Sequence, residues 1–253
     1  MISKEAGLMN QALEAVRADR AALLEICSGL TAADWQAPSG CEGWTVQDLV
    51  AHLGALFWVV VDPAKLPGTD GMPTEQAQEM LVRSRRGLSA EAVLEDYEQV
   101  SDVALQRLAE LAALDFTIPL GDLGTYPAAV LPAAFSFDHY THIRADLFAP
   151  RGPLTGTPPP SDELRLEPTL DWAEAALPQQ NPVAAEVGTY ELQVTGAAGR
   201  IITFGTGQAM ATVSSSAPDF ILWVTQRASW DDLGVQATGD EPALSAARKL
   251  KVF

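Results

Sequence analysis

Cysteine is scarce in this sequence, which has only Cys27 and Cys41 among 253 residues. Two cysteines cannot build the disulfide framework of a small secreted protein, so a reducing cytoplasm is the expected compartment. Neither residue lies in a paired-thiol motif. Cys27 falls on the first predicted helix, where we expect it to be buried and unreactive.

Basic residues and long apolar runs are also few. Lys and Arg number 16 against 33 Asp and Glu, which gives a formal charge of −17. A chain of this charge repels nucleic-acid phosphates and anionic membranes, so neither is an expected partner. No apolar run approaches the roughly 20 residues that a membrane-spanning helix requires. Residues 1–6 lack the basic start and apolar core of a secretory signal, which again favours a cytoplasmic protein.

The remaining composition is that of a folded protein with two domains. Hydrophobic residues make up 47% of the chain and charged residues 19%, far from the composition of disordered proteins. A length of 253 residues is long for one core and sufficient for two. Pro and Gly crowd residues 150–160, and together they interrupt helices and strands alike. We therefore expect a first domain over residues 1–150 and a second over 151–253.

The first of these domains shows helical patterns. Apolar residues recur at helical spacing from Ser3 to Leu30, which predicts a long amphipathic helix. Thr45 and Asp48 form a variant of the capping box, with Asp in the usual Glu place, so a second helix is expected to begin near Val46. Further helices are expected over 74–88, from a cap at Ser89 to about Leu114, and over 127–148 with an alternative start near Pro132.

Beyond the linker the pattern becomes mixed. Thr189–Val194 and Arg200–Phe204 alternate as strands, and Gly196–Gly199 between them predicts a hairpin turn. A third strand is expected near 210–214, and helices are expected over 168–177, 218–226 and 242–250. The second domain is therefore predicted to be a small α+β domain.

The chain has three histidines, His52, His139 and His142, and each falls in a predicted helix. Asp138 and His142 lie four residues apart, a spacing at which two side chains on one helical face can bind a single ion. Antiparallel helices of a bundle can bring His52 to the same interior. Two imidazoles and one carboxylate leave a coordination position open, as catalytic metal sites do.

Two alternatives stay open at this point. A lone histidine in a helix is more often a hydrogen-bonded core or surface residue than a metal ligand. His139 is also a rival third ligand, since it lies three residues before His142. Helical geometry turns it about 100° away from Asp138, so both side chains cannot point at one ion equally well.

One segment resembles a known family. The chain is similar, at Asp34-Trp35, Pro38 and Cys41-Glu42-Gly43-Trp44-Thr45-Val46-Gln47-Asp48-Leu49-Val50-Ala51-His52-Leu53, to the opening of the DinB-like, mycothiol-dependent maleylpyruvate isomerase family of actinobacteria. In that family a Gly-Trp-Thr-Val run leads into the first metal-binding histidine, and a later Glu-x-x-x-His supplies two more ligands. The resemblance implies a DinB-like four-helix bundle with His52, Asp138 and His142 as ligands. Asp stands here where the family has Glu, which shortens the ligand arm by one methylene. The superfamily's three-histidine arrangement would recruit His139 instead.

The resemblance extends to the second domain. Residues 217–227 and 235–244 resemble the family's C-terminal, sterol-carrier-like α+β domain, which ends in a Gly-Asp turn and a final helix. Arg227 resembles an arginine that this domain contributes to the active cleft, where it would bind a carboxylate of the substrate or cofactor as a catalytic residue. The other interpretation is a solvated arginine at a helix end.

The implied activity is that of an enzyme that uses a metal and mycothiol on a small-molecule substrate. A divalent metal, Zn²⁺ first with Ni²⁺ and Fe²⁺ as alternatives, would bind the thiol and favour its thiolate. Thiol addition to a cis double bond, rotation and expulsion of the thiolate give an isomerase, whereas retention of the adduct gives a thiol transferase. The alternative is a non-catalytic metal- or small-molecule-binding protein on the same scaffold, including one that has lost its metal.

Four further residues lie near these motifs. Trp44 either stacks on a bound cofactor or packs at the start of its helix. Asp146, four residues after His142, either orients that histidine or is exposed. Arg144 and Asp48 are expected to be a surface residue and a capping residue, respectively.

Overall fold

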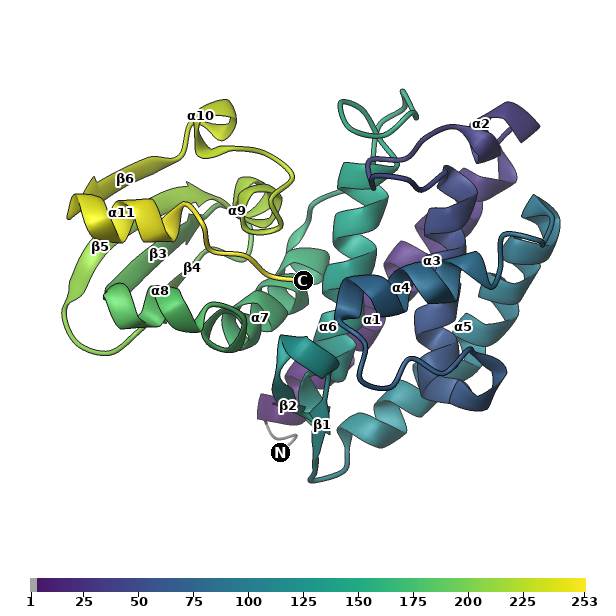
Figure 1. Cartoon of the computed structure of the whole chain (residues 1–253), viewed down its shortest axis with the longest axis horizontal. Helices are drawn as coiled ribbons and strands as arrows, with labels where there is room; N and C mark the ends of the chain where they lie inside the picture. Colours follow the sequence, from purple (N-terminus) through teal and green to yellow (C-terminus); the bar gives the residue numbers. More distant parts are fainter. Residues whose placement is uncertain (1–3) are drawn as a thin grey trace.

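The computed structural model describes residues 4–253, in which a helical region is followed by a smaller region built on a four-stranded sheet (Figure 1). This confirms the two-domain α+β architecture. The helices are α1 (Lys4–Ser28), α2 (Ala32–Gln36), α3 (Val46–Val61), α4 (Thr74–Arg83), α5 (Ala90–Ala112), α6 (Leu131–Thr141), α7 (Glu163–Gln180), α8 (Pro182–Val187), α9 (Ala217–Val224), α10 (Trp230–Leu233) and α11 (Glu241–Ala247). The strands are β1 (Thr117–Pro119), β2 (Thr125–Pro127), β3 (Thr189–Thr195), β4 (Arg200–Phe204), β5 (Ala209–Ser216) and β6 (Gln236–Gly239). Within this range no helix has the length and hydropathy needed to cross a membrane.

Four long helices, α1, α3, α5 and α6, pack against one another in the helical region. Their apolar faces share a core that contains Val16, Leu23, Leu49, Phe57 and Leu108, all with no exposed surface. Burial of such stripes is what holds amphipathic helices in a bundle.

The helix starts follow the caps that the sequence predicts. Thr45 Oγ1 accepts a hydrogen bond of 3.1 Å from the Asp48 N–H, and an Asp48 carboxylate oxygen accepts one of 3.2 Å from the Thr45 N–H. The capping box is therefore confirmed, and α3 begins at Val46 as expected. Ser89 caps α5 in the same way through the Ala92 N–H.

Some boundaries differ from the predictions. Pro127 ends strand β2, so the helix expected from that residue begins at Leu131 and matches the alternative start near Pro132. α4 ends at Arg83, short of the expected residue 88. The predicted start of the first helix at Ser3 lies outside the described residues.

α7 begins before Pro168, the residue at which the sequence pattern placed its start. The Asp162 side chain caps the helix by accepting a hydrogen bond from the Arg165 N–H, so the first turn forms upstream of the proline. The helix continues through Pro168 and Pro178 to Gln180.

The C-terminal sheet has the strand order β4-β3-β5-β6. β3 and β4 are antiparallel around the expected turn, β3 and β5 are parallel, and β5 and β6 are antiparallel. Alternate residues of β3, Tyr190, Leu192 and Val194, are buried in a core shared with α7, α9 and α11. The apolar residues whose alternation predicted β3 are therefore the ones that the strand buries.

α7 connects the two regions, because it packs against α1 and α6 on one side and against α9 and β4 on the other. The core around the sheet continues into the helical region through Tyr126, Phe137 and Tyr140. This contact holds the C-terminal region against the end of α6. The division of the chain at residue 150 stays our prediction.

Candidate metal centre

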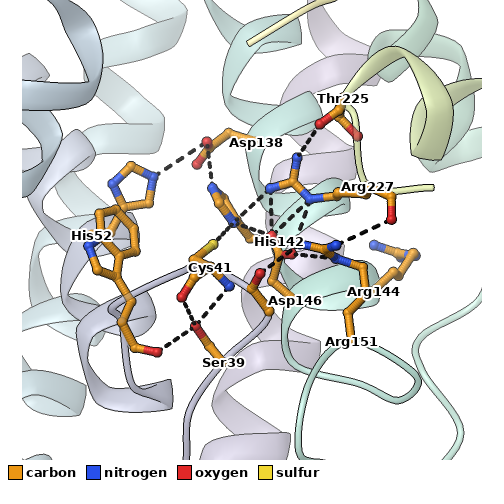
Figure 2. Close-up of polar contacts among 12 residues, drawn as sticks. Ser39, Cys41, His52, Asp138, His142, Arg144, Asp146, Arg151, Thr225 and Arg227 are labelled. Atoms are coloured by element: carbon orange, nitrogen blue, oxygen red, sulfur yellow. Dashed lines mark hydrogen bonds and ion pairs between the residues drawn. The ribbon is translucent and has the colours of Figure 1, made fainter. Parts of the chain in front are cut away.

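His52, Asp138 and His142 converge between α3 and the end of α6 (Figure 2). Oδ1 of Asp138 lies 3.5 Å from Nε2 of His52 and 3.4 Å from Nε2 of His142. The three donor atoms lie within 4.8 Å of one another. The structure thus brings together the three residues that the sequence analysis selected as metal ligands.

The local structure explains why these side chains meet. The capping box fixes the first turn of α3, and His52 follows about two turns later on its buried face. Asp138 and His142 share one face at the end of α6 because they are four residues apart. His142 begins a π-helical turn that runs to Asp146, a type of turn that is often found at functional sites.

The donor atoms suit a divalent cation. Bonds of about 2.0–2.2 Å in a tetrahedral zinc site place neighbouring donor atoms about 3.3–3.6 Å apart, which agrees with the separations around Asp138. Both ring nitrogens of His52 and Oδ2 of Asp138 are buried without a hydrogen-bond partner among residues 4–253. Buried polar atoms normally have partners, and a cation bound beside Asp138 would supply one to Nε2 of His52 and to the Asp138 carboxylate. Imidazole nitrogens with one carboxylate are a common zinc donor set.

The three side chains also control one another's charge. Burial raises the pKa of Asp138, but His142 and His52 beside it outweigh burial and bring the pKa well below its usual value. Burial lowers the pKa of His142, but Asp138 and Asp146 outweigh it and bring the pKa well above its usual value. The carboxylate is therefore ready as an anionic ligand, whereas His142 must lose a proton before it can bind a cation.

Asp146 orients His142. Its Oδ2 lies 2.8 Å from Nδ1 of His142, and its side chain is fully buried, which excludes the exposed alternative. A carboxylate that accepts the Nδ1 proton fixes the tautomer in which Nε2 is free for a metal. Burial raises the pKa of Asp146, but hydrogen bonds and charge from His142 and Arg227 bring it below the usual value.

Arg227 reaches from the C-terminal region to this carboxylate. Its Nε lies 3.1 and 3.0 Å from the two oxygens of Asp146, and its Nη2 lies 3.5 Å from Nδ1 of His142. Only 16% of the side chain is exposed, so it is not the solvated arginine of the second interpretation. Burial lowers the pKa of Arg227, but Asp146 outweighs it and raises the pKa. Its contact with a substrate or cofactor stays a prediction.

Trp44 lies next to the first histidine. Its ring centroid is 5.0 Å from that of His52, and its Nε1 donates a hydrogen bond of 2.8 Å to Glu79. The indole is therefore held in place at one side of the cluster. Its role in cofactor binding stays a prediction.

His139, the rival third ligand, lies in a different environment. Its Nε2 is 3.1 Å from the Tyr97 hydroxyl and its Nδ1 is 2.9 Å from the Phe135 carbonyl oxygen, so both nitrogens have partners. Its ring packs 5.1 Å from that of Phe57 in the bundle core. We therefore keep Asp138 in the ligand set that we propose.

The expectation of a surface position for Arg144 is wrong. Its guanidinium is 8% exposed and lies 2.8 Å from a carboxylate oxygen of Asp19, which is fully buried. Arg165 binds the same carboxylate at 2.7 Å. Both arginines are therefore buried because they pair with Asp19, a buried acid on α1. The periodicity of one helix could not reveal a partner on another helix.

Cys41 is a neighbour of the site that the sequence reasoning did not select. Its Sγ lies 3.6 Å from Nδ1 of His142, and the three groups of Cys41, His142 and Asp146 have ligand atoms within 4.8 Å of one another. Its position in the loop that leads to Gly43-Trp44 was the one signal available. The cysteine and the histidine are 101 residues apart, so spacing along the chain could not connect them.

Comparisons with known proteins agree with this architecture. Residues 16–140 match a family described as the mycothiol maleylpyruvate isomerase N-terminal domain. A crystal structure of the mycothiol-dependent maleylpyruvate isomerase is similar with a TM-score of 0.59 and 19% sequence identity. A histidine-to-alanine mutant of that enzyme gives 0.57 and 18%. Both alignments cover 93% of this chain and 95% of the other, and at such identities they show a shared fold. No curated protein sequence matches the chain.

Proposed function

Because the helical domain of this chain belongs to the mycothiol maleylpyruvate isomerase N-terminal domain family, we propose that the protein is a metal-dependent enzyme that uses mycothiol. The reaction is addition of the thiol to an electrophilic small molecule, with either cis-trans isomerisation or transfer of the thiol as its outcome. The observation that carries this proposal is the convergence of His52, Asp138 and His142 with unpartnered donor atoms.

The three ligands would hold a divalent cation, with Zn²⁺ the best match to the donor set. Two imidazoles and a carboxylate leave one coordination position for the sulfur of the thiol. When bound, the cation supplies the positive charge that lowers the pKa of that thiol and favours the thiolate at neutral pH.

The other residues of the site position the ligands. Asp146 holds the Nδ1 proton of His142 and so keeps its Nε2 lone pair directed at the cluster. Arg227 binds Asp146 with its Nε and Nη2 groups, and its Nη1 makes a single long contact of 3.5 Å with the Thr225 carbonyl oxygen. Each Nη group of a guanidinium carries two N–H donors, so one N–H of Nη1 is left to bind a carboxylate of the substrate.

Metal analysis followed by a thiol assay tests the proposal. We expect purified protein to bind about one Zn²⁺, Ni²⁺ or Fe²⁺ ion per chain and to consume mycothiol or isomerise a cis alkene only when that ion is present. His52→Ala is expected to remove both properties, whereas His139→Gln is expected to keep the metal. Retention of metal by His52→Ala would contradict the ligand set. Metal binding without any thiol-dependent turnover would instead indicate the non-catalytic binding protein.

A further inference from the structure

A cavity of about 420 Å³ lies between the helical region and the C-terminal region. One wall is formed by the end of α6 and the π-helical turn, a second by residues 149–151, and a third by α9, α10 and the segment between them. We call it the interdomain cavity. Its volume falls within the range of small-molecule sites, roughly 300–1,000 Å³.

The interdomain cavity is distinct from the metal cluster. None of His52, Asp138 and His142 is among the residues that line it, whereas Thr141 and Ala145 of the same helix are. Residues one position apart point to different sides of a helix, so one face carries the ligands and the next face carries the cavity wall. Arg227 and Arg151 border both, since each lines the cavity and each lies beside Asp146, Arg227 at 3.0 Å and Arg151 at 3.5 Å.

Most of the cavity wall is apolar. Ile221 and Leu222 of α9, Leu233 of α10 and Pro150 of the connecting segment line it. A mainly apolar wall with a few charged groups at its edge is typical of sites that bind the hydrophobic body of a small molecule.

The charged groups at the cavity are mostly cationic, although the chain as a whole carries a charge of −17. Three arginines, Arg144, Arg151 and Arg227, line the cavity together with a single acid, Asp232. The carboxylate of Asp232 is engaged at the start of α10, where it accepts hydrogen bonds from Ser229. Arg144 and Arg227 are each paired with a buried carboxylate, Asp19 and Asp146 respectively, so Arg151 is the arginine whose charge is most available to an anion.

Arg151 is the arginine best placed to receive that anion. Its side chain is 36% exposed, more than those of the other two arginines. Its Nη1 and Nη2 each donate to one carbonyl oxygen, of Arg227 and Gly40, and its Nε is 3.5 Å from Asp146. Each Nη group carries two N–H bonds, so two donors remain for a carboxylate.

We propose that the interdomain cavity binds an apolar monocarboxylate, whose hydrophobic body packs on Ile221, Leu222 and Leu233 and whose carboxylate pairs with Arg151. This proposal goes beyond the metal chemistry and does not require it. Aliphatic and aromatic acids both combine an apolar body with one carboxylate. A comparison of their affinities shows which of the two classes the cavity prefers.

Titration calorimetry on the full chain tests the proposal. The probes are decanoate and 4-phenylbutyrate as apolar acids, 1-decanol as a neutral analogue and succinate as a polar diacid. We expect one acid to bind with a stoichiometry of one and at least tenfold more tightly than either comparison compound. The better of the two acids identifies the shape of the natural ligand.

Two substitutions locate the bound acid. Leu222→Trp fills the cavity and is expected to weaken binding at least tenfold, whereas Val183→Trp, at a residue 72% exposed and outside the cavity, is the matched control. Arg151→Gln is expected to weaken binding of the acid about tenfold and to leave the alcohol unchanged, with Arg107→Gln as its control. Ala228→Phe replaces the first variant if Leu222→Trp does not fold.

The metal content of every variant is measured alongside. Loss of acid binding with unchanged metal content supports a separate cavity, and it does so whether or not the enzyme proposal is correct. Binding of succinate as tight as that of the better apolar acid, no binding of either apolar acid, or unchanged binding of the better acid by Leu222→Trp would overturn the proposal.

Discussion

Replacement of Asp138 by Asn is the sharpest test of the candidate metal centre. The amide keeps the size of the side chain but loses the charge, and it leaves Nε2 of both histidines without their shared anionic neighbour. We therefore expect a large loss of cation affinity with little change in the fold. Competition with a zinc chelator gives the affinity, and elemental analysis gives the stoichiometry.

The magnitude follows from the number of ligands. A structural zinc site gains roughly 10–16 kcal/mol from four protein ligands, or about 2.5–4 kcal/mol for each ligand. Because 1.4 kcal/mol is a factor of ten, Asp138→Asn should weaken Zn²⁺ binding about 100- to 1,000-fold. Asp138→Glu restores the longer arm and the charge, so it should lose less than tenfold and can gain affinity. The contrast between the two variants separates the effect of charge from that of reach.

A second carboxylate of the same region provides the control. Asp96 is partly buried, accepts hydrogen bonds from Trp58 and lies 3.6 Å from the guanidinium of Arg85. Asp96→Asn should leave zinc affinity within threefold of the parent protein. If Asp138→Asn also stayed within threefold, the cluster would not be the cation site and the reasoning from donor separations would be refuted.

Three further predictions address the surroundings of the site. Burial raises the pKa of Cys27 to about 12, so iodoacetamide at pH 8 should alkylate Cys41 at least ~100-fold faster, as measured by peptide mass spectrometry. Arg227→Gln leaves the buried Asp146 without its main cationic partner, so the free energy of unfolding measured in urea should fall by about 3 kcal/mol. The pKa of His142 is held above its usual value, and a protonated imidazole cannot bind metal. Zinc affinity should therefore rise with pH, by about tenfold per unit below that pKa.

Each of these predictions has an outcome that contradicts it. Equal alkylation of both cysteines in the folded chain would show that Cys27 is accessible. Arg107→Gln, in an exposed ion pair, should cost less than about 1 kcal/mol, and an equal cost for Arg227→Gln would mean that Asp146 is not dependent on its partner. A zinc affinity independent of pH would place His142 outside the ligand set.

Local patterns allowed much of the fold to be predicted. The capping box at Thr45 sets the start of α3 because both partners lie within four residues, and strand β4 has the predicted bounds because its alternation is local. Elements of three to five residues, such as α2, β1, β2 and β6, were missed because they are shorter than the windows in which periodicity is visible. Pro168 gave a wrong start for α7 because the cap at Asp162 overrides it.

The residues of the candidate site likewise fall into those predicted from local spacing and those placed by tertiary packing. Asp138 and His142 were selected because their spacing of four residues is a property of one helix, and His52 followed from its helix and motif. The position of Arg227, 81 residues from Asp146, depends on the packing of the two regions, and that of Cys41, 101 residues from His142, depends on the packing within the helical region. The partners that determine charge and orientation could therefore be identified only in the folded chain.

The C-terminal region contributes to the orientation of residues that lie along one helical face of the candidate site. Asp138, His142 and Asp146 succeed one another at intervals of four residues, across the junction between α6 and the π-helical turn. The first two belong to the candidate metal cluster, and the third lies 2.8 Å from Nδ1 of the second. Asp146 is itself held by Arg227, so the orientation of His142, a proposed ligand in the helical region, depends on a side chain of the C-terminal region. Any movement of one region relative to the other would act on His142 through this carboxylate, so we include the contact between the two regions in the candidate metal centre.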